Sequence, residues 1–153
     1  LHAYLHGVGV EIMANSDNVL RGGLTSKHID VPELMHVVQF DALLDPIAPA
    51  ENVVLSSHGI VPAEGIETVE YLTPVPEFRL SRSHLAPCRE SHLGIEGPFI
   101  VLVTEGTVTL TSRECPEGLS VSAGHAAWVG AWEDRPTIAT GENSATVFIA
   151  RVP

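Results

Sequence analysis

The last hundred residues of the chain are a succession of short apolar segments separated by turn residues, and this pattern limits the folds open to it. Seven segments are rich in Val, Ile, Leu, Thr and aromatic residues, as β-strands are: 68–72, 78–82, 98–103, 107–111, 119–121, 126–129 and 145–150. Glu105-Gly106 and the segment 122–125 have the composition of hairpin turns. Seven or more short strands with frequent turns predict a mainly β fold, an antiparallel sandwich or jelly roll.

The composition supports a packed domain and argues against two classes of partner. Hydrophobic residues make up 44% of the chain and charged residues 18%, a balance typical of globular domains rather than disordered chains. Lys and Arg number 8 against 19 acidic residues, giving a net charge of −11, so nucleic acid is not an expected partner. The longest apolar stretches are about six residues, too short to cross a bilayer, so no membrane association is expected. A small anionic substrate is compatible with this charge, because one or two cations in a pocket suffice.

The first thirteen residues alternate in character with a period of two, which predicts two short strands. Gly7 and Gly9 interrupt the alternation as a turn or bulge would. His2, Tyr4 and His6 then lie on one face. The following residues, 14–29, are polar and have no clean period, so they predict a loop.

A short helix is predicted to follow this loop. Asp30 is a suitable N-cap, Glu33 stands three positions later as in a capping box, and Pro32 falls in the first turn, where its missing N–H is harmless. The helix should end near Phe40. Its apolar stripe has the i, i+3, i+4, i+7 spacing and consists of Val31, Leu34, Met35 and Val38.

The segment 45–52 holds two prolines and is the predicted linker between residues 1–44 and residues 53–153. Two cysteines, Cys88 and Cys115, lack the spacing of a zinc ribbon or a CxxC motif. They could form a disulfide, but free, buried thiols in a cytosolic protein are favoured.

Residues able to do chemistry are concentrated before residue 30. They supply an imidazole, two carboxylates, an amide and two cations: His2, Glu11, Asp17, Asn18, Arg21 and Lys27. Each also has a structural interpretation. An isolated histidine is more often a surface residue than a ligand, because a metal needs three or four converging donors. Asp17-Asn18 could be turn chemistry and Arg21 part of a solvated loop.

The run from His2 to Lys27 closely resembles the signature region of the type I mannose-6-phosphate isomerase (phosphomannose isomerase) family. That pattern is written roughly as HAYL followed by VExMAxSDNVxRxGLTPK, and this chain matches it without a gap as HAYL and then VEIMANSDNVLRGGLTSK. The departure is Ser26, where proline is usual; it touches no proposed ligand.

The resemblance implies an activity and a set of roles. Family members are zinc-dependent aldose-ketose isomerases that interconvert mannose 6-phosphate and fructose 6-phosphate, moving a proton between C1 and C2 through a cis-enediol. His2 matches the last of four zinc ligands, the others lying upstream of Leu1, with one ion per full-length chain. Arg21 matches the essential arginine. The proton is expected to be moved by a buried carboxylate, and Glu11 is the candidate base. It could instead orient a neighbouring residue or Arg21 by an ion pair. The matching lysine of the pattern is Lys27, which could assist the substrate phosphate, and Tyr4 would line the pocket.

The resemblance also implies a domain organisation. Residues 1–44 would complete a catalytic zinc-binding cupin domain whose other part lies upstream, and residues 53–153 would form a cupin-like jelly roll. We expect that second domain to be metal-free. No HxH pair occurs, and Ala127 stands where a metal-binding cupin has the histidine of its PxGxxH turn. Three histidines of the domain, His84, His92 and His125, are then expected at the surface or in turns.

The chain opens without an initiator methionine inside an apolar, aromatic run, so we expect a fragment. On its own it should be inactive, because a single imidazole does not hold catalytic zinc at useful affinity. The alternatives are a cupin-like sugar-binding or regulatory domain without catalysis, or a structural lid or interaction domain. An acidic protein of sugar-phosphate metabolism with reduced thiols is expected in the cytoplasm. The oligomeric state is not predicted.

Overall fold

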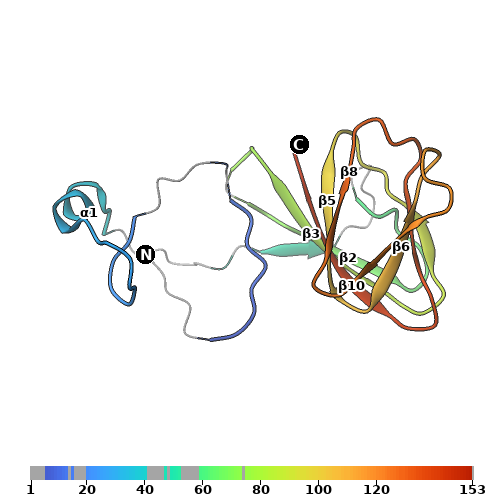
Figure 1. The fold of residues 1–153 in the computed structure, drawn as a ribbon, viewed down its shortest axis with the longest axis horizontal. Coiled ribbons are helices and arrows are strands. Elements are labelled where there is room, and N and C mark those ends of the chain that lie inside the picture. The colour runs from blue at the N-terminus through green and yellow to red at the C-terminus, as the bar shows by residue number, and fades with distance from the viewer. Residues whose placement is uncertain are drawn as a thin grey trace. The chain divides into compact units, whose positions relative to one another are not determined.

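A computed structural model describes residues 6–13, 15, 20–40, 47, 49–52, 59–73 and 75–152. The chain divides into two compact units, Leu1–Pro46 and Ile47–Pro153 (Figure 1). The division falls inside the segment 45–52, which holds the two prolines. Within the described residues, no helix is long and apolar enough to cross a membrane.

The first unit contains one helix, α1, which spans Val31–Val37. The predicted cap is confirmed: Glu33 N donates to Asp30 Oδ1 at 3.1 Å, and Leu34 N donates to Asp30 O at 2.9 Å. The helix ends at Val37 rather than near Phe40, because Val38 has extended backbone angles. None of its residues is buried.

The predicted strands near the amino terminus do not appear in residues 6–13, which carry no regular secondary structure. A strand is stable only when a neighbouring strand exchanges backbone hydrogen bonds with it. No strand is described elsewhere in the first unit. The alternation of residues 1–5 lies outside the described part of the chain.

The second unit is built from two antiparallel sheets, and the predicted mainly β jelly roll is confirmed (Figure 1). The six-stranded sheet has the order β1-β2-β3-β10-β5-β8 and the four-stranded sheet the order β4-β9-β6-β7. The strands are β1 (Ala50–Asn52), β2 (Ile66–Tyr71), β3 (Arg79–Leu85), β4 (Glu90–His92), β5 (Phe99–Glu105), β6 (Thr107–Thr111), β7 (Leu119–Ser122), β8 (Ala126–Val129), β9 (Thr137–Thr140) and β10 (Ala145–Arg151).

Each of the seven predicted strands corresponds to a strand of the structure, and three further strands were missed. The missed strands β1 and β4 have three residues each, too few to show an alternation. The third, β9, has four residues, as do the predicted strands β7 and β8. Strand β1 corrects the predicted linker, since Ala50–Asn52 pair with residues 69–71 of β2. The β domain therefore begins before residue 53.

The two predicted hairpin turns are corners between the sheets. Glu105-Gly106 connects β5 of the six-stranded sheet to β6 of the four-stranded sheet, and residues 123–125 connect β7 to β8 in the opposite direction. Composition indicates that the chain reverses, but it does not say which sheet the next strand joins. Gly106 has a φ of 73°, and a Cβ built on it would lie 2.2 Å from Ser144 O.

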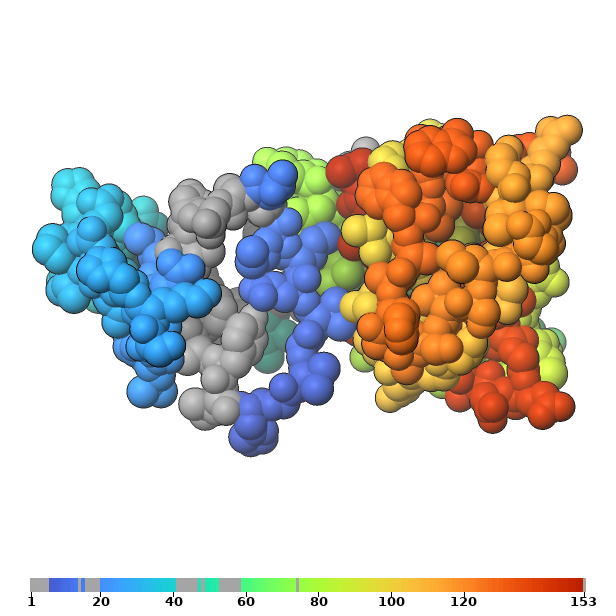
Figure 2. All heavy atoms as spheres, in the orientation of Figure 1, coloured from blue at the N-terminus to red at the C-terminus, as the bar shows by residue number. Residues whose placement is uncertain are grey.

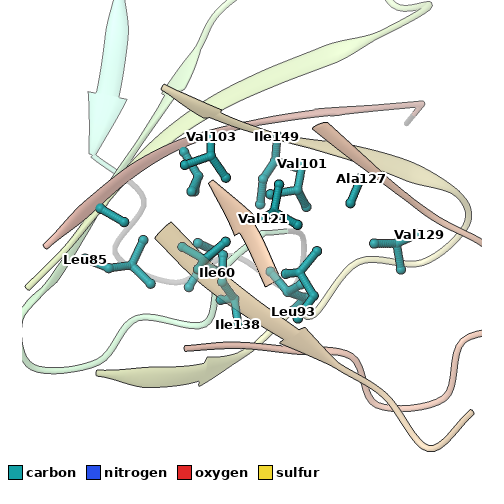
Figure 3. Close-up of a cluster of buried hydrophobic side chains, with 14 of the residues drawn as sticks. Ile60, Leu85, Leu93, Val101, Val103, Val121, Ala127, Val129, Ile138 and Ile149 are labelled. Atoms are coloured by element: carbon teal, nitrogen blue, oxygen red, sulfur yellow. The ribbon is translucent and has the colours of Figure 1, made fainter. Parts of the chain in front are cut away.

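The core of the second unit lies between the two sheets and is formed by alternate residues of the strands (Figure 3). On β5 these are Phe99, Val101 and Val103, and on β10 they are Val147 and Ile149. Burial of each such side chain contributes about 1.5–3 kcal/mol to folding. All members of this cluster are apolar, so it offers no metal ligand.

Candidate functional site

The structure describes three of the five residues predicted for the site. His2 and Tyr4 lie outside the described residues, as do Asp17 and Asn18 of the same motif. Glu11, Arg21 and Lys27 are described, and all three belong to the first unit.

Arg21 is half-buried, and its loop passes directly against helix α1. A Cβ built on the next residue, Gly22, would lie 3.1 Å from Leu34 Cδ2. That separation is tighter than ordinary van der Waals contact, so only glycine fits there without displacing Leu34. The helix therefore positions the backbone on which Arg21 stands.

The loop beyond Arg21 is held by two short-range hydrogen bonds. Thr25 N donates to Gly23 O at 2.7 Å, and Lys27 N donates to Thr25 Oγ1 at 3.1 Å. These bonds fold residues 23–27 into a tight turn with an exposed Lys27. Gly22 and Thr25 were not predicted as positioning residues. The pair of glycines that follows Arg21 could have indicated the role of Gly22. The role of Thr25 could have been found from the tendency of threonine to accept a hydrogen bond from the backbone N–H two residues later.

Glu11 forms one wall of an open pocket of about 450 Å³, lined by His6, Gly7, Val8, Gly9, Val10 and Glu11. The Glu11 side chain is exposed, whereas the role of base was argued for a buried carboxylate. His6 is the other ionisable residue of this pocket and is exposed too.

The described residues do not bring these side chains into contact with one another. Within them, Glu11, Arg21 and Lys27 form no ion pair, so the suggested pairing of Glu11 with Arg21 is absent there. No three His, Cys, Asp or Glu residues among them converge to hold a metal ion. A catalytic zinc needs three protein ligands, so the described residues do not fit one.

In the second unit, the chemistry-bearing residues are dispersed. His84, His92 and His125 are exposed, and Ala127 is buried. Cys88 and Cys115 are free, as predicted, but they are not both buried: Cys88 is exposed and Cys115 is partly buried. No side chain of the apolar core is able to ligate a metal, and the absence of metal from this unit stays a prediction.

Comparison with known proteins confirms the resemblance and extends it along the chain. The chain is 36% identical to the mannose-6-phosphate isomerase of Salmonella typhimurium over 140 residues, which is 92% of this chain and 32% of that protein. It is 34% identical to the enzyme of Escherichia coli, over 96% of this chain and 34% of the relative, and 33% identical to that of Bos taurus, over 86% and 30%. The chain thus spans about a third of the length of these curated relatives. No family profile matches it.

Solved structures similar to the chain confirm the cupin fold. A cupin 2 conserved barrel domain protein from Salinispora arenicola matches 62% of this chain and 82% of its own, with a TM-score of 0.51 and 16% identity. The polyketide cyclase RemF from Streptomyces resistomycificus matches 73% of this chain and 78% of its own, with a TM-score of 0.51 and 15% identity. At these identities the likeness concerns the fold alone.

Proposed function

We propose that this chain is part of a mannose-6-phosphate isomerase and supplies the arginine that stabilises the charged intermediate of the reaction. The observation that carries the proposal is the similarity to curated isomerases over 86–98% of the chain. The activity is proposed for the full-length protein, since this chain spans about a third of its relatives.

The proposed reaction explains why an arginine is needed. Interconversion of mannose 6-phosphate and fructose 6-phosphate moves a proton between C1 and C2 of the open sugar through a cis-enediol, and negative charge develops on the attached oxygens. A guanidinium held in place before the reaction stabilises that charge. Arg21 suits this role because it is half-buried and because Gly22 packs its loop against α1.

The other residues have supporting roles in the proposal. Glu11 is the candidate base, Lys27 would contact the substrate phosphate, and Tyr4 would line the pocket. Glu11 and Lys27 are exposed in this chain, so both roles require the rest of the protein to cover them. Replacing Glu11 with Gln in the full-length enzyme tests the first role, since unchanged turnover would place the base elsewhere.

Zinc is proposed on the resemblance alone. His2 would be one ligand and the others would come from residues upstream, while the described residues provide no converging set. We therefore derive no step of the reaction through the metal. Zinc analysis of the full-length His2→Ala protein tests the assignment, because a full complement of zinc in that variant would contradict it.

The decisive experiment compares arginine variants in the full-length protein, with production of fructose 6-phosphate followed by a coupled assay. Arg21→Ala should lower kcat by about 10²–10³-fold, the cost of removing one charge-stabilising group, while bound zinc is retained. Arg113→Ala is the matched control, because Arg113 is an exposed arginine of the second unit. Wild-type kcat in Arg21→Ala would refute the role. Absence of isomerase activity in the wild-type full-length protein would refute the proposed function.

The alternative, a sugar-binding or regulatory domain without catalysis, draws on one feature of the structure. The second unit has a complete core of its own, whereas the described residues of the first unit include none that is buried. Calorimetric titration of the 153-residue chain with mannose 6-phosphate distinguishes the two, because the alternative requires binding and the isomerase proposal does not. The cytoplasm is the proposed location, where sugar phosphates are metabolised.

A further inference from the structure

The second unit contains a cavity of about 120 Å³ that none of the proposed roles uses. It lies between β6 and β7 of one sheet and β8 of the other, with Leu110, Leu119 and Ala127 among the residues that line it. In Figure 3, Ala127 and Val129 occupy the inner side of β8. The side chain of Ala127 is small, so it leaves space at this inward position that a larger side chain would fill.

The surfaces of this cavity are mainly apolar. Leu93, Leu110 and Val129 contribute from the buried core. Trp128 and Leu119 also line it, and they are 60% and 51% exposed. A mainly apolar cavity with a few polar groups is typical of a binding site for a small molecule.

One side of the cavity is polar and is held by hydrogen bonds. The Ser112 hydroxyl donates to a Glu133 carboxylate oxygen, and Cys115 N donates to Ser112 Oγ at 3.1 Å. Arg113 N donates to Asp134 O at 3.0 Å, which ties the loop after β6 to the loop after β8. The Glu133 carboxylate retains acceptor capacity beyond the bond from Ser112, since an ionised carboxylate has about four lone-pair positions.

We propose that this cavity binds a small apolar molecule with one hydrogen-bond donor, such as a phenol or a short branched alcohol. The apolar part would lie against Leu110 and Ala127, and the donor would bond to Glu133. The volume of about 120 Å³ is of the same order as that of an apolar protein cavity of about 150 Å³ that accommodates benzene. A hexose phosphate does not suit this cavity, whose lining offers few groups for its hydroxyls and no cation for its phosphate. The site is therefore independent of the proposed isomerase reaction.

The test is an NMR titration of the 153-residue chain with phenol, with toluene as the probe that lacks a donor. Phenol should shift the backbone amides of residues 110–115 and 127–129 saturably, with a dissociation constant on the order of millimolar. Toluene should bind at least about threefold more weakly, because it leaves the carboxylate without a donor. Absence of saturable shifts at these amides would overturn the proposal, as would equal affinity for the two probes.

Two alanines of β8 provide a matched pair of variants. Ala127→Leu places its side chain in the cavity and should weaken phenol binding at least about tenfold. Ala126→Leu makes the same change at the exposed neighbouring residue and should leave binding unchanged. Equal loss in both variants, or no loss in Ala127→Leu, would overturn the site.

The two free cysteines keep the test decisive if Ala127→Leu does not fold. Cys115 lines the cavity and Cys88 is exposed elsewhere. Phenol should slow modification of Cys115 by an aryl disulfide at least about threefold, as expected for a mostly occupied site, and leave the rate at Cys88 unchanged. Equal rates at Cys115 with and without saturating phenol would count against occupancy of the cavity.

Discussion

Glu70 and Arg151 join two strands that are not neighbours in their sheet. Arg151 Nη2 lies 3.3 Å from Glu70 Oε2, and the pair spans β3, which separates β10 from β2. Arg79 of β3 stands directly opposite Arg151 in the register, and its Nε lies 3.7 Å from Glu70 Oε1. One carboxylate therefore neutralises two adjacent cations, of which Arg151 has a side chain only 9% exposed.

Replacing the shared carboxylate should cost more than replacing the outer cation. Glu70→Gln leaves two facing arginines without their counter-charge and should lower the free energy of unfolding by about 1.5–3 kcal/mol. Arg79→Gln should lower it by about 1 kcal/mol, because Arg79 is 34% exposed and its contact with Glu70 is longer. This figure includes the loss of its long hydrogen bonds to Val75 O and Thr73 Oγ1, at 3.3 and 3.4 Å. Urea unfolding measures both, and equal effects would show that the two arginines do not share Glu70 as described.

Two glycines at the corners between the sheets allow a second comparison of variants. Gly106 and Gly124 have φ of 73° and 83°, so alanine is strained at either position. At Gly124 a Cβ meets nothing within 4 Å, whereas at Gly106 it would meet Ser144 O. Gly124→Ala should therefore destabilise by about 1 kcal/mol and Gly106→Ala by about 2–4 kcal/mol. The midpoints of urea unfolding of the two variants measure this difference. A larger destabilisation in Gly124→Ala than in Gly106→Ala would contradict the corner geometry.

These corners show where sequence reasoning about the fold succeeded and where it stopped. Period-two alternation and β-branched residues are local signals, and they located seven of the ten strands. The identity of the sheet that each strand joins depends on contacts between distant residues, so Glu105-Gly106 was interpreted as a hairpin. Strand β1 has only three residues and exists because β2 offers a partner.

A buried hydrogen bond between β2 and β3 supports a third prediction. Thr68 Oγ1 and Ser83 Oγ are 2.7 Å apart, and the two residues are 8% and 1% exposed. Thr68→Val or Ser83→Ala should each destabilise by about 1–3 kcal/mol, because each leaves one buried hydroxyl unpaired. The double variant should be less destabilised than the sum of the two. Strict additivity in this double-mutant cycle would indicate that the hydroxyls do not interact.

The cap of α1 is testable by hydrogen exchange. Asp30→Ala removes the side chain that accepts from Glu33 N, which should cost about 1 kcal/mol and raise exchange at Leu34 and Val38 about fivefold. Asp30→Asn should retain protection, since asparagine caps as well as aspartate. The amide of Val147, in the second unit, is the internal reference. Unchanged exchange in Asp30→Ala would mean that the cap does not stabilise the helix.

The candidate site was less predictable than the fold. The motif identified Arg21, Glu11 and Lys27 by residue type, but burial and mutual contacts are not local properties. Glu11 was expected to be a buried carboxylate and is exposed. The close approach of Gly22 to Leu34 joins a loop to a helix twelve residues later, and the spacing of the motif gives no indication of it.

That approach leads to a prediction about catalysis in the full-length protein. Gly22→Ala needs Leu34 to move by a few tenths of an ångström, which a partly exposed side chain can do, so kcat should stay within about twofold of wild type. Gly22→Val requires a larger displacement of the loop that carries Arg21, and kcat should fall at least about tenfold, since small misplacements of a catalytic group are costly. Gly141→Val is the control, because Gly141 has open space around it.

A second substitution separates positioning from general damage. Leu34→Ala removes the atom that a valine at position 22 would meet, so adding it to Gly22→Val should restore most of the lost kcat. Leu34→Ala alone should have a small effect, because Leu34 is only partly buried. Rescue would show that the helix acts on Arg21 through this one contact. A double variant no more active than Gly22→Val would instead assign the loss to the valine itself, and α1 would have no part in positioning the arginine.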